Sequence, residues 1–194
     1  MKRFLMILSA VLMAVACNDE DTLLTERDNI EKFLTSTRRM VVEEERENTI
    51  ENNPPFYTIF GRYAYRHIVN FYESGREDRV VVESGDEIEV LFSAYTFTGS
   101  EPSSSKPYWS NVPEVIASLG KHGELAWSAE PLIMRLGSTD IIEGLDRSLV
   151  GCREQDSVQI FMTSSMAYGR KLIGSEPKNA SLAWYMRIGK VYKR

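Results

Sequence analysis

The feature of this sequence that most constrains its fold is a change in the period of its apolar residues. Before residue 48 they recur at close to 3.6 positions, as on one side of a helix, and after residue 55 they recur at two, as on one side of a strand. The change falls at Asn52-Asn53-Pro54-Pro55, where neither proline suits a helix interior. The sequence therefore predicts a helical extension over residues 17–53 and a strand-rich domain over residues 54–194.

The extension is predicted to contain one amphipathic helix from about Glu26 to Glu47. Thr25-Glu26-Arg27-Asp28 has the spacing of a capping box, with Asp in place of the usual Glu. The apolar stripe that follows consists of Ile30, Phe33, Leu34, Met40 and Val41. Because the stripe is interrupted at Thr37 and is too short for a coiled coil, a monomer is expected. The role of the helix could be that of a spacer, a dimerisation element or a lid.

The second part of the chain has segments rich in aromatic, β-branched or alternating apolar residues, which predict strands. These segments are residues 64–71, 88–92, 157–162 and 182–188. Between them an apolar stripe of Ile141, Ile142, Leu145 and Leu149 stops at Gly151, which predicts one short helix. The predicted fold class is α+β, with antiparallel strands packed on this helix. Residues 101–130 are less regular and are predicted to be a loop insertion, with a short helix between Pro113 and Gly120.

The first residues have the features of a signal peptide, predicted over residues 1–16. Lys2 and Arg3 precede an apolar run that is shorter than the roughly 20 residues of a membrane-spanning helix. The run closes on Ala14-Val15-Ala16-Cys17, which resembles the lipobox of bacterial lipoproteins with Ala in place of the usual Leu. The resemblance implies lipid on Cys17 and hence attachment to a membrane, and a free cysteine after an ordinary signal is the alternative.

The residues after the predicted cleavage point, Asn18-Asp19-Glu20-Asp21, are predicted to form an acidic tether. They resemble the surface-export signals of lipoproteins in Bacteroides-like bacteria, and a solvated linker is an equally good interpretation. The expected location is the cell envelope, at the outer membrane, facing either the periplasm or the surface. Removal of Lys2 and Arg3 takes the formal net charge from −5 to −7, which argues against binding to nucleic acid or, through side chains, to anionic lipid.

Conventional catalytic machinery is not found in the sequence. His67 and His122 are its only histidines, and a structural or surface role is expected for His67. No Cys/His cluster has metal-ligand spacing, and there is no Gly-x-Ser-x-Gly elbow or phosphate-binding glycine loop, so neither a metal nor another cofactor is predicted. If Cys17 carries lipid, Cys152 has no cysteine partner, and the fold must be held by its core.

Five segments, in order, resemble the motifs of FKBP-type peptidyl-prolyl isomerases. They are Gly85 to Tyr95 (in the family Gly-(x)4-Val-x-Tyr-x-Gly), Pro131 to Gly137 (Pro-Phe-x-Phe-x-Leu-Gly), Ile141 to Asp146 (Val-Ile-x-Gly-Trp-Asp/Glu) with Leu149-Val150-Gly151-Cys152, then Ala167-Tyr168-Gly169, and Pro177 to Trp184 (Pro-x-(Asn/His)-x-x-Leu-x-Phe). The resemblance covers about Val80 to Tyr192. It implies an FKBP-like antiparallel β-sheet, a half-barrel wrapped around one short helix, with the N-terminal helix as an extension.

The resemblance also implies the residues of the site. The two polar anchors would be the backbone N–H of Ile142 and the hydroxyl of Tyr168, each binding a substrate carbonyl. The substrate-binding residues would be Phe92, Tyr108, Trp109, Leu132, Met134, Ile141, Leu145, Ile173 and Trp184. Trp109 stands where the family has a pocket Asp, and Leu145 stands where it has a floor Trp. A less aromatic cleft and weak or altered activity are therefore expected.

The predicted function is isomerisation of X-Pro bonds, with proline-containing peptides or unfolded exported proteins as partners. Rotation about a peptide bond has a barrier of about 18 to 20 kcal/mol because resonance keeps the amide planar. A dry apolar pocket disfavours the planar, dipolar form relative to the twisted one, and no proton transfer is needed. The alternatives are a binding or chaperone module without useful turnover, and a surface adhesin or assembly subunit that uses residues 101–130.

Overall fold

The computed structural model describes residues 20–36, 41–42, 55–59, 61–124, 126–169 and 177–194. Its strands are β1 (Val41–Val42), β2 (Phe56–Ile59), β3 (Ala64–Ile68), β4 (Glu87–Thr96), β5 (Trp109–Ser110), β6 (Leu132–Arg135), β7 (Ser157–Met162) and β8 (Leu182–Tyr192). Its α-helices are residues 20–36, named here the N-terminal helix, α2 (Pro113–Leu119) and α3 (Glu143–Leu149). Its 3-10 turns are η1 (Arg76–Asp78), η2 (Pro102–Ser104) and η3 (Ser164–Met166).

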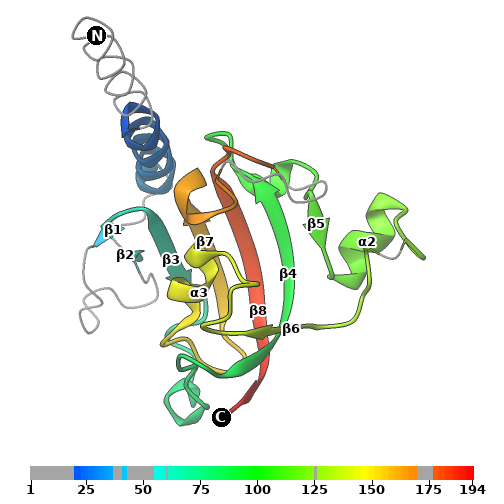
Figure 1. Ribbon diagram of the computed structural model, residues 1–194. Coiled ribbons are helices and arrows are strands. Elements are labelled where there is room, and N and C mark those ends of the chain that lie inside the picture. The colour runs from blue at the N-terminus through cyan, green and yellow to red at the C-terminus, as the bar shows by residue number, and fades with distance from the viewer. Residues whose placement is uncertain (1–19, 37–40, 43–54, 60, 125, 170–176) are drawn as a thin grey trace, which may run out of the picture.

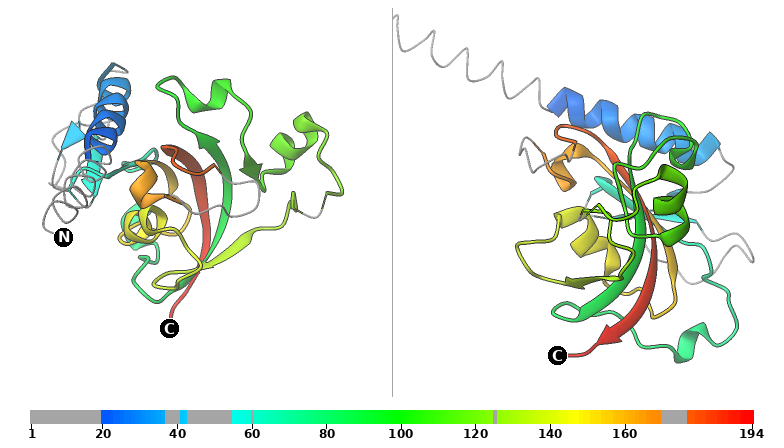
Figure 2. Two further views of the ribbon diagram at one scale, coloured as in Figure 1. Left: turned by 45° about the horizontal axis from the view of Figure 1, so that its top comes forward. Right: turned by 90° about the vertical axis from the view of Figure 1, so that its right-hand side faces the viewer.

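The described strands form one eight-stranded sheet, in the order β1-β2-β3-β7-β8-β4-β5, and β6 also pairs with β4 (Figure 1). Neighbouring strands are antiparallel except β1 and β2. β5 and β6 share one edge of β4, β5 along Ser93–Ala94 and β6 along Glu87–Val90. The right-hand view of Figure 2 shows β4 and β8 bowed, with α3 on their concave side. The predicted α+β class, with a sheet wrapped around one short helix, is confirmed.

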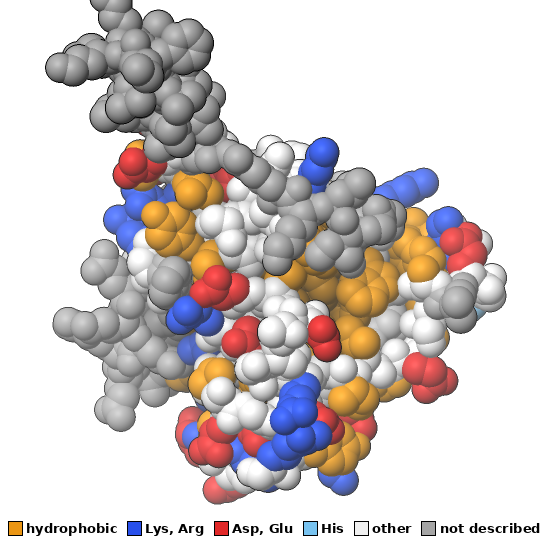
Figure 3. Space-filling model, in the orientation of Figure 1, with side chains coloured by type: hydrophobic (Ala, Val, Ile, Leu, Met, Phe, Trp, Pro, Cys, Tyr) orange, Lys and Arg blue, Asp and Glu red, His pale blue; other side chains and the backbone are white. Residues whose placement is uncertain are grey.

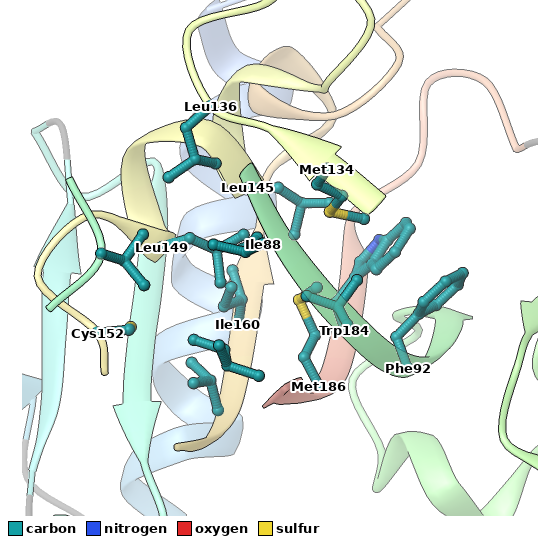
Figure 4. Close-up of a cluster of buried hydrophobic side chains, with 14 of the residues drawn as sticks. Ile88, Phe92, Met134, Leu136, Leu145, Leu149, Cys152, Ile160, Trp184 and Met186 are labelled. Carbon is teal, nitrogen blue, oxygen red and sulfur yellow. The ribbon is translucent and has the colours of Figure 1, made fainter. Parts of the chain in front are cut away.

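Alternation along the strands gives the sheet two apolar faces. The face toward α3 carries what we call the concave core, which includes Ile88, Phe92, Leu145, Leu149, Ile160 and Trp184 (Figure 4). The opposite face carries the convex core, beneath the N-terminal helix, which includes Ile30, Leu34, Phe56, Tyr65, Phe97 and Phe161. On β7 the change of face is visible between neighbours, since Ile160 and Met162 belong to the concave core and Phe161 to the convex core.

The N-terminal helix differs from the predicted one. The chain is helical over residues 20–36, whereas the prediction was about 26–47, so Glu20 and Asp21 belong to a helix and not to a linker. Thr25 lies inside this helix, where its hydroxyl donates to the carbonyl oxygen of Asp21, 2.9 Å away, and does not cap a helix start. The predicted cap was therefore wrong, because the same residue type can bond backward within a helix as well as forward at its start.

The end of the predicted helix was also wrong, because Val41 and Val42 form β1 and pair with Phe56 and Tyr57 of β2. A β-branched pair suits a strand once a partner strand is available, and this tertiary pairing overrides the helical spacing. Residues 43–47, the predicted signal peptide and Cys17 lie outside the described residues. No helix within the described ranges is long and apolar enough to cross a bilayer. The division at residues 53 and 54 stays a prediction.

The predicted insertion at residues 101–130 is partly built into the sheet. Trp109 and Ser110 form β5 and pair with β4, so the segment that leaves the sheet begins after them and returns at β6. The short helix predicted within it is confirmed as α2, with Pro113 at its first position. Gly120 ends α2 in a left-handed conformation (φ 66°), which a residue without a side chain adopts without strain.

Candidate active site

The concave side of the sheet opens into a cleft of about 930 Å³. It lies between β5, β6, α3, the segment after η3, and β8, and its lining includes Trp109, Leu132, Met134, Ile141, Ile142, Leu145, Tyr168 and Trp184. Figure 3 shows apolar side chains gathered on this side of the molecule, between its middle and the side where α2 projects. A concave, mainly apolar cleft of this size is the usual form of a small-ligand site.

The floor of the cleft is formed by Trp184 of β8, with Leu145 of α3 and Met134 of β6 beside it (Figure 4). The indole of Trp184 is 1% exposed and stacks on Phe92, with ring centroids 4.7 Å apart and planes 26° from parallel. Phe92 itself does not line the cleft, because it is completely buried beneath the indole. The floor is therefore a rigid aromatic pair flanked by two flexible aliphatic side chains.

One wall is Trp109 of β5. Its ring meets Phe92 and Trp184 edge to face, with centroids 4.7 and 6.0 Å apart. Its indole N–H donates to the carbonyl oxygen of Ala126, 3.1 Å away, which ties the segment between β5 and β6 to the wall. Tyr108 lies next to this wall, with its ring 6.4 Å from Trp184 and 6.5 Å from Tyr168. Trp109 therefore joins the sheet, the floor and the inserted segment.

The opposite rim is the turn from β6 into α3. Gly137 turns the chain in a left-handed conformation (φ 77°), and its N–H donates to Asp146 Oδ1, 2.7 Å away on the first turns of α3. Ile142 is the residue before α3, with extended backbone, and its carbonyl accepts from the N–H groups of Leu145 and Asp146. The N–H of Ile142 donates to no acceptor within the described part of the chain, so a ligand carbonyl can take it.

Tyr168 closes the cleft from the segment that follows η3. The carbonyl of Ser164 accepts from the N–H groups of Ala167 and Gly169, the two neighbours of Tyr168, at 3.2 and 2.9 Å. Gly144 lets α3 approach this segment, because a Cβ there would lie 2.6 Å from Met162 Sδ and 2.9 Å from the carbonyl oxygen of Met166. The absence of a side chain at residue 144 thus lets α3 pack closely against Met162 and Met166, just before Tyr168.

Several polar groups inside the cleft can donate hydrogen bonds, among them the Ile142 N–H and the Tyr168 hydroxyl. The indole N–H of Trp184 is buried and has no hydrogen-bond partner in the described residues. Charged side chains, Arg135, Asp140 and Glu143, lie at the exposed edge. In the described ranges no three His, Cys, Asp or Glu side chains gather as metal ligands would. The apolar interior of the cleft suits an uncharged ligand, and its N–H and O–H groups can donate to carbonyl oxygens.

The sequence profile of the FKBP-type peptidyl-prolyl cis-trans isomerase family matches residues 79–188, more than half of the chain. The chain belongs to this family. A comparison with curated proteins finds no match. The matched FKBP range runs from just before β4 into β8 and contains every described residue that lines the cleft. It leaves out the N-terminal helix and β1 to β3, which the same sheet and the convex core nonetheless include.

The FKBP fold brings together most of the residues that the sequence predicted for the site. Those lining one cleft are Trp109, Leu132, Met134, Ile141, Ile142, Leu145, Tyr168 and Trp184. Phe92 and Tyr108 are not among the lining residues. Phe92 stacks beneath Trp184 of the floor, and the ring of Tyr108 packs next to the wall. Ile173 lies outside the described residues. His67, expected to be structural or at the surface, is completely buried and stacks on Phe56.

The prediction missed the polar residues of the FKBP cleft edge and one residue behind its wall. Ser138, Thr139 and Asp140 line the cleft, and their position between two motif segments that both border it was a usable signal. Asn111 is 4% exposed, and its amide donates to the carbonyls of Val90 and Glu130 while its oxygen accepts from Phe92 N–H at 2.6 Å. It fastens both ends of the inserted segment to β4, a role that no local pattern indicates.

Proposed function

We propose that this FKBP-family chain is a peptidyl-prolyl cis-trans isomerase that acts on X-Pro bonds of exported or envelope proteins. The observation that carries the proposal is the pairing, in one apolar cleft, of the open N–H of Ile142 with the side chain of Tyr168 across a tryptophan floor. Substrates would be proline-containing segments in which the carbonyls on either side of proline meet these two donors.

The physical basis is differential binding of the twisted amide. An X-Pro bond loses its resonance as it twists, and with the resonance goes the extra negative charge on the carbonyl oxygen. Apolar walls such as Trp184, Leu145 and Met134 stabilise this less dipolar state relative to the planar one. Each 1.4 kcal/mol or so of such preference is worth about tenfold in rate, so a few contacts suffice.

Two departures from the family motifs are proposed to change the activity. Trp109 occupies the place of the pocket Asp. It is held in the wall of the cleft by its edge-to-face contact with Phe92 and by the hydrogen bond from its indole N–H to the carbonyl oxygen of Ala126. Leu145 occupies the place of the floor Trp, and the indole of Trp184 from β8 provides the floor instead. A cleft altered in this way is expected to be slower, or to prefer a different residue before proline.

The test is a protease-free isomerisation assay on an X-Pro peptide with the full chain, Tyr168→Phe and Ile142→Asp. Matched controls are Tyr192→Phe, a tyrosine on the exposed end of β8, and Val69→Asp, at an exposed valine outside the cleft. We expect the two site variants to lose at least about tenfold in kcat/KM, because each loses or obstructs a donor, and the controls to stay near the unmodified chain. No rate above buffer at micromolar chain would overturn the enzymatic proposal.

A second candidate is a binding module without useful turnover, and the replacement of the pocket Asp by Trp109 is the observation that favours it. The same variants separate the two functions. If the unmodified chain binds proline peptides, Tyr168→Phe weakens that binding, and no turnover is measured, the module is the better description. If turnover is measured and falls in the site variants, isomerase is the better description.

The setting of the domain is proposed from Cys17, which would carry lipid and hold the chain at the outer membrane. The proposal predicts that the protein partitions into the detergent phase and incorporates radiolabelled palmitate. Cys17→Ala should abolish both, whereas Cys152→Ala should change neither. Protease treatment of intact cells would then distinguish the outer surface from the periplasm, and label retained in Cys17→Ala would contradict lipidation at this residue.

A further inference from the structure

The N-terminal helix touches the segment that carries Tyr168, although it lies outside the matched family range. The carboxylate of Glu26 accepts a hydrogen bond from the backbone N–H of Ser164, with Oε2 and N 2.7 Å apart. Ser164 is the first residue of η3, and the preceding Thr163 provides no side-chain cap. An N–H at the start of such a turn needs an acceptor, and here the acceptor comes from another element of the fold.

Ser164 is also the residue on which the following segment is folded. Its carbonyl accepts from Ala167 N–H and Gly169 N–H, so both neighbours of Tyr168 are bonded to one peptide group. The Ser164 residue is 9% exposed. A shift of Ser164 therefore moves the backbone on both sides of Tyr168 and displaces its hydroxyl from the cleft.

Glu26 is held in place because the helix that carries it is docked firmly. Ile30 and Leu34 of the same helix are 0% and 1% exposed, because they pack into the convex core. Glu31, a little more than one turn further along, accepts from Arg62 Nε at 2.8 Å and from the Tyr65 hydroxyl at 2.7 Å. These contacts of Glu31 are with β3 and the turn before it, and they do not involve Ser164.

We propose that Glu26 is a positioning residue, which caps η3 and holds Tyr168 in its place in the cleft. The inference rests on the proposed isomerase function only for its kinetic consequence. The N-terminal helix is then a working part of the site, and neither a spacer nor a lid. Since the same helix follows the predicted lipid anchor in the sequence, it would link that anchor to the element that carries Tyr168.

The test compares Glu26→Ala, Glu26→Gln and Glu31→Ala in the full chain, purified in mild detergent. Glu26→Ala removes the acceptor, Glu26→Gln keeps an acceptor oxygen, and Glu31→Ala breaks the other polar contact of the same helix. We expect Glu26→Ala to lower kcat/KM about three- to tenfold, mainly by raising KM, because Tyr168 binds a substrate carbonyl in both the ground and the transition state. Glu26→Gln should recover most of the loss, and Glu31→Ala should leave the kinetics unchanged.

Amide hydrogen exchange provides a readout that does not need activity. In Glu26→Ala the N–H groups of residues 164 to 169 should exchange at least about tenfold faster, while those of β3 keep the unmodified rate. Glu31→Ala should show no such change at residues 164 to 169. If Glu26→Ala leaves both exchange and KM unchanged, or if Glu31→Ala lowers kcat/KM as much as Glu26→Ala does, the proposal is overturned. If the unmodified chain does not isomerise, the isomerase proposal fails and the exchange result still decides the positioning role.

Discussion

The two faces of the sheet are covered by different helices and differ in what lies beneath them. The concave face is covered by α3, a short helix of Glu143–Leu149, and the uncovered remainder becomes the cleft. The convex face is covered by the longer N-terminal helix, residues 20–36, and beneath it aromatic rings pack together, with the ring centroid of Phe33 5.3 Å from that of Phe97 and 5.6 Å from that of Phe161. The same strands supply both faces. One sheet thus has a cleft on the face that the short helix covers and a packed aromatic core on the face that the longer helix covers.

The composition of the two faces agrees with this division of roles. Four methionines belong to the concave core, Met134, Met162, Met166 and Met186, whereas the described convex core contains aromatic and aliphatic residues only. Methionine side chains are flexible and adapt to different neighbours, and of these four Met134 lines the cleft, where it can adapt to a ligand. Interlocked aromatic rings adapt less and give a rigid base.

The largest expected effect comes from removing one leucine on either face. Leu145→Ala and Leu34→Ala each empty a site that is at most 2% exposed and should each cost about 2 to 5 kcal/mol of unfolding free energy. Leu145→Ala should also reduce isomerisation strongly because the floor of the cleft loses its flank, and Leu34→Ala should reduce it less, because it acts only through a looser N-terminal helix. Urea denaturation and the peptide assay measure the two quantities. Equal loss of activity in both variants would contradict the separation of the faces.

The next effect in size concerns the contact between α3 and η3. Gly144→Ala places a methyl group 2.9 Å from the Met166 carbonyl oxygen, so α3 must move away. The unfolding free energy of the protein should fall by about 1 to 3 kcal/mol. The movement separates Ile142 from Tyr168, and kcat/KM should fall with the stability. The matched control is Ser148→Ala on the same helix, whose buried hydroxyl has no partner in the described residues. If Gly144→Ala is as harmless as this control, close packing here does not set the site.

How far the fold could be predicted is clear from particular elements. Residues 157–162 and 182–188 alternate so regularly that β7 matched its prediction and β8 only extended beyond it. β1 and β5 are short and exist only because β2 and β4 offer them partners, so no local pattern could indicate them. Thr25 had the spacing of a cap, but local spacing cannot say whether a hydroxyl bonds forward or backward.

The cleft was predictable to a similar degree. The motif segments carried the lining residues, because each motif occupies a fixed place in the half-barrel. The bond between Glu26 and Ser164 joins residues 138 positions apart, and the three bonds of Asn111 reach Val90 and Phe92 on β4 and Glu130 before β6. Such contacts depend on how elements come together, and a single sequence contains no signal for them. The support of the site is therefore what the structure adds.

A smaller effect should appear when pH weakens the attachment of the N-terminal helix. Burial raises the pKa of Glu31, but the hydrogen bonds from Arg62 and Tyr65 more than offset this, so the pKa lies below its ordinary value of 4.5. A carboxylate with a lowered pKa contributes stability that is fully present above 4.5 and is lost as pH falls through the folded-state pKa. The unmodified chain should therefore be more stable than Glu31→Gln at pH 7, and the difference should shrink below pH 4.5. Urea midpoints at several pH values measure it, and a constant difference would contradict the ionic role of Glu31.

The smallest expected change compares two neighbours on β8 that point to opposite faces. Trp184→Phe, which introduces the residue of the family motif, removes an indole N–H that has no partner among the described residues and keeps an aromatic ring over Phe92. Tyr185→Phe removes a hydroxyl that donates to Glu101 at 2.7 Å on the other face. Each should cost less than about 1.5 kcal/mol, and Trp184→Phe should cost no more than Tyr185→Phe, because an unsatisfied donor is unfavourable where it stands.

The kinetic comparison at Trp184 then tests what the floor contributes. If the floor acts by shape and dryness, Trp184→Phe keeps kcat/KM within about threefold, which corresponds to well under one kcal/mol. A larger loss with unchanged stability would mean that the indole N–H reaches the substrate in the bound state and serves as a third donor. A loss of stability above about 2 kcal/mol would instead mean that the larger ring is needed to fill the concave core, as an emptied core site requires.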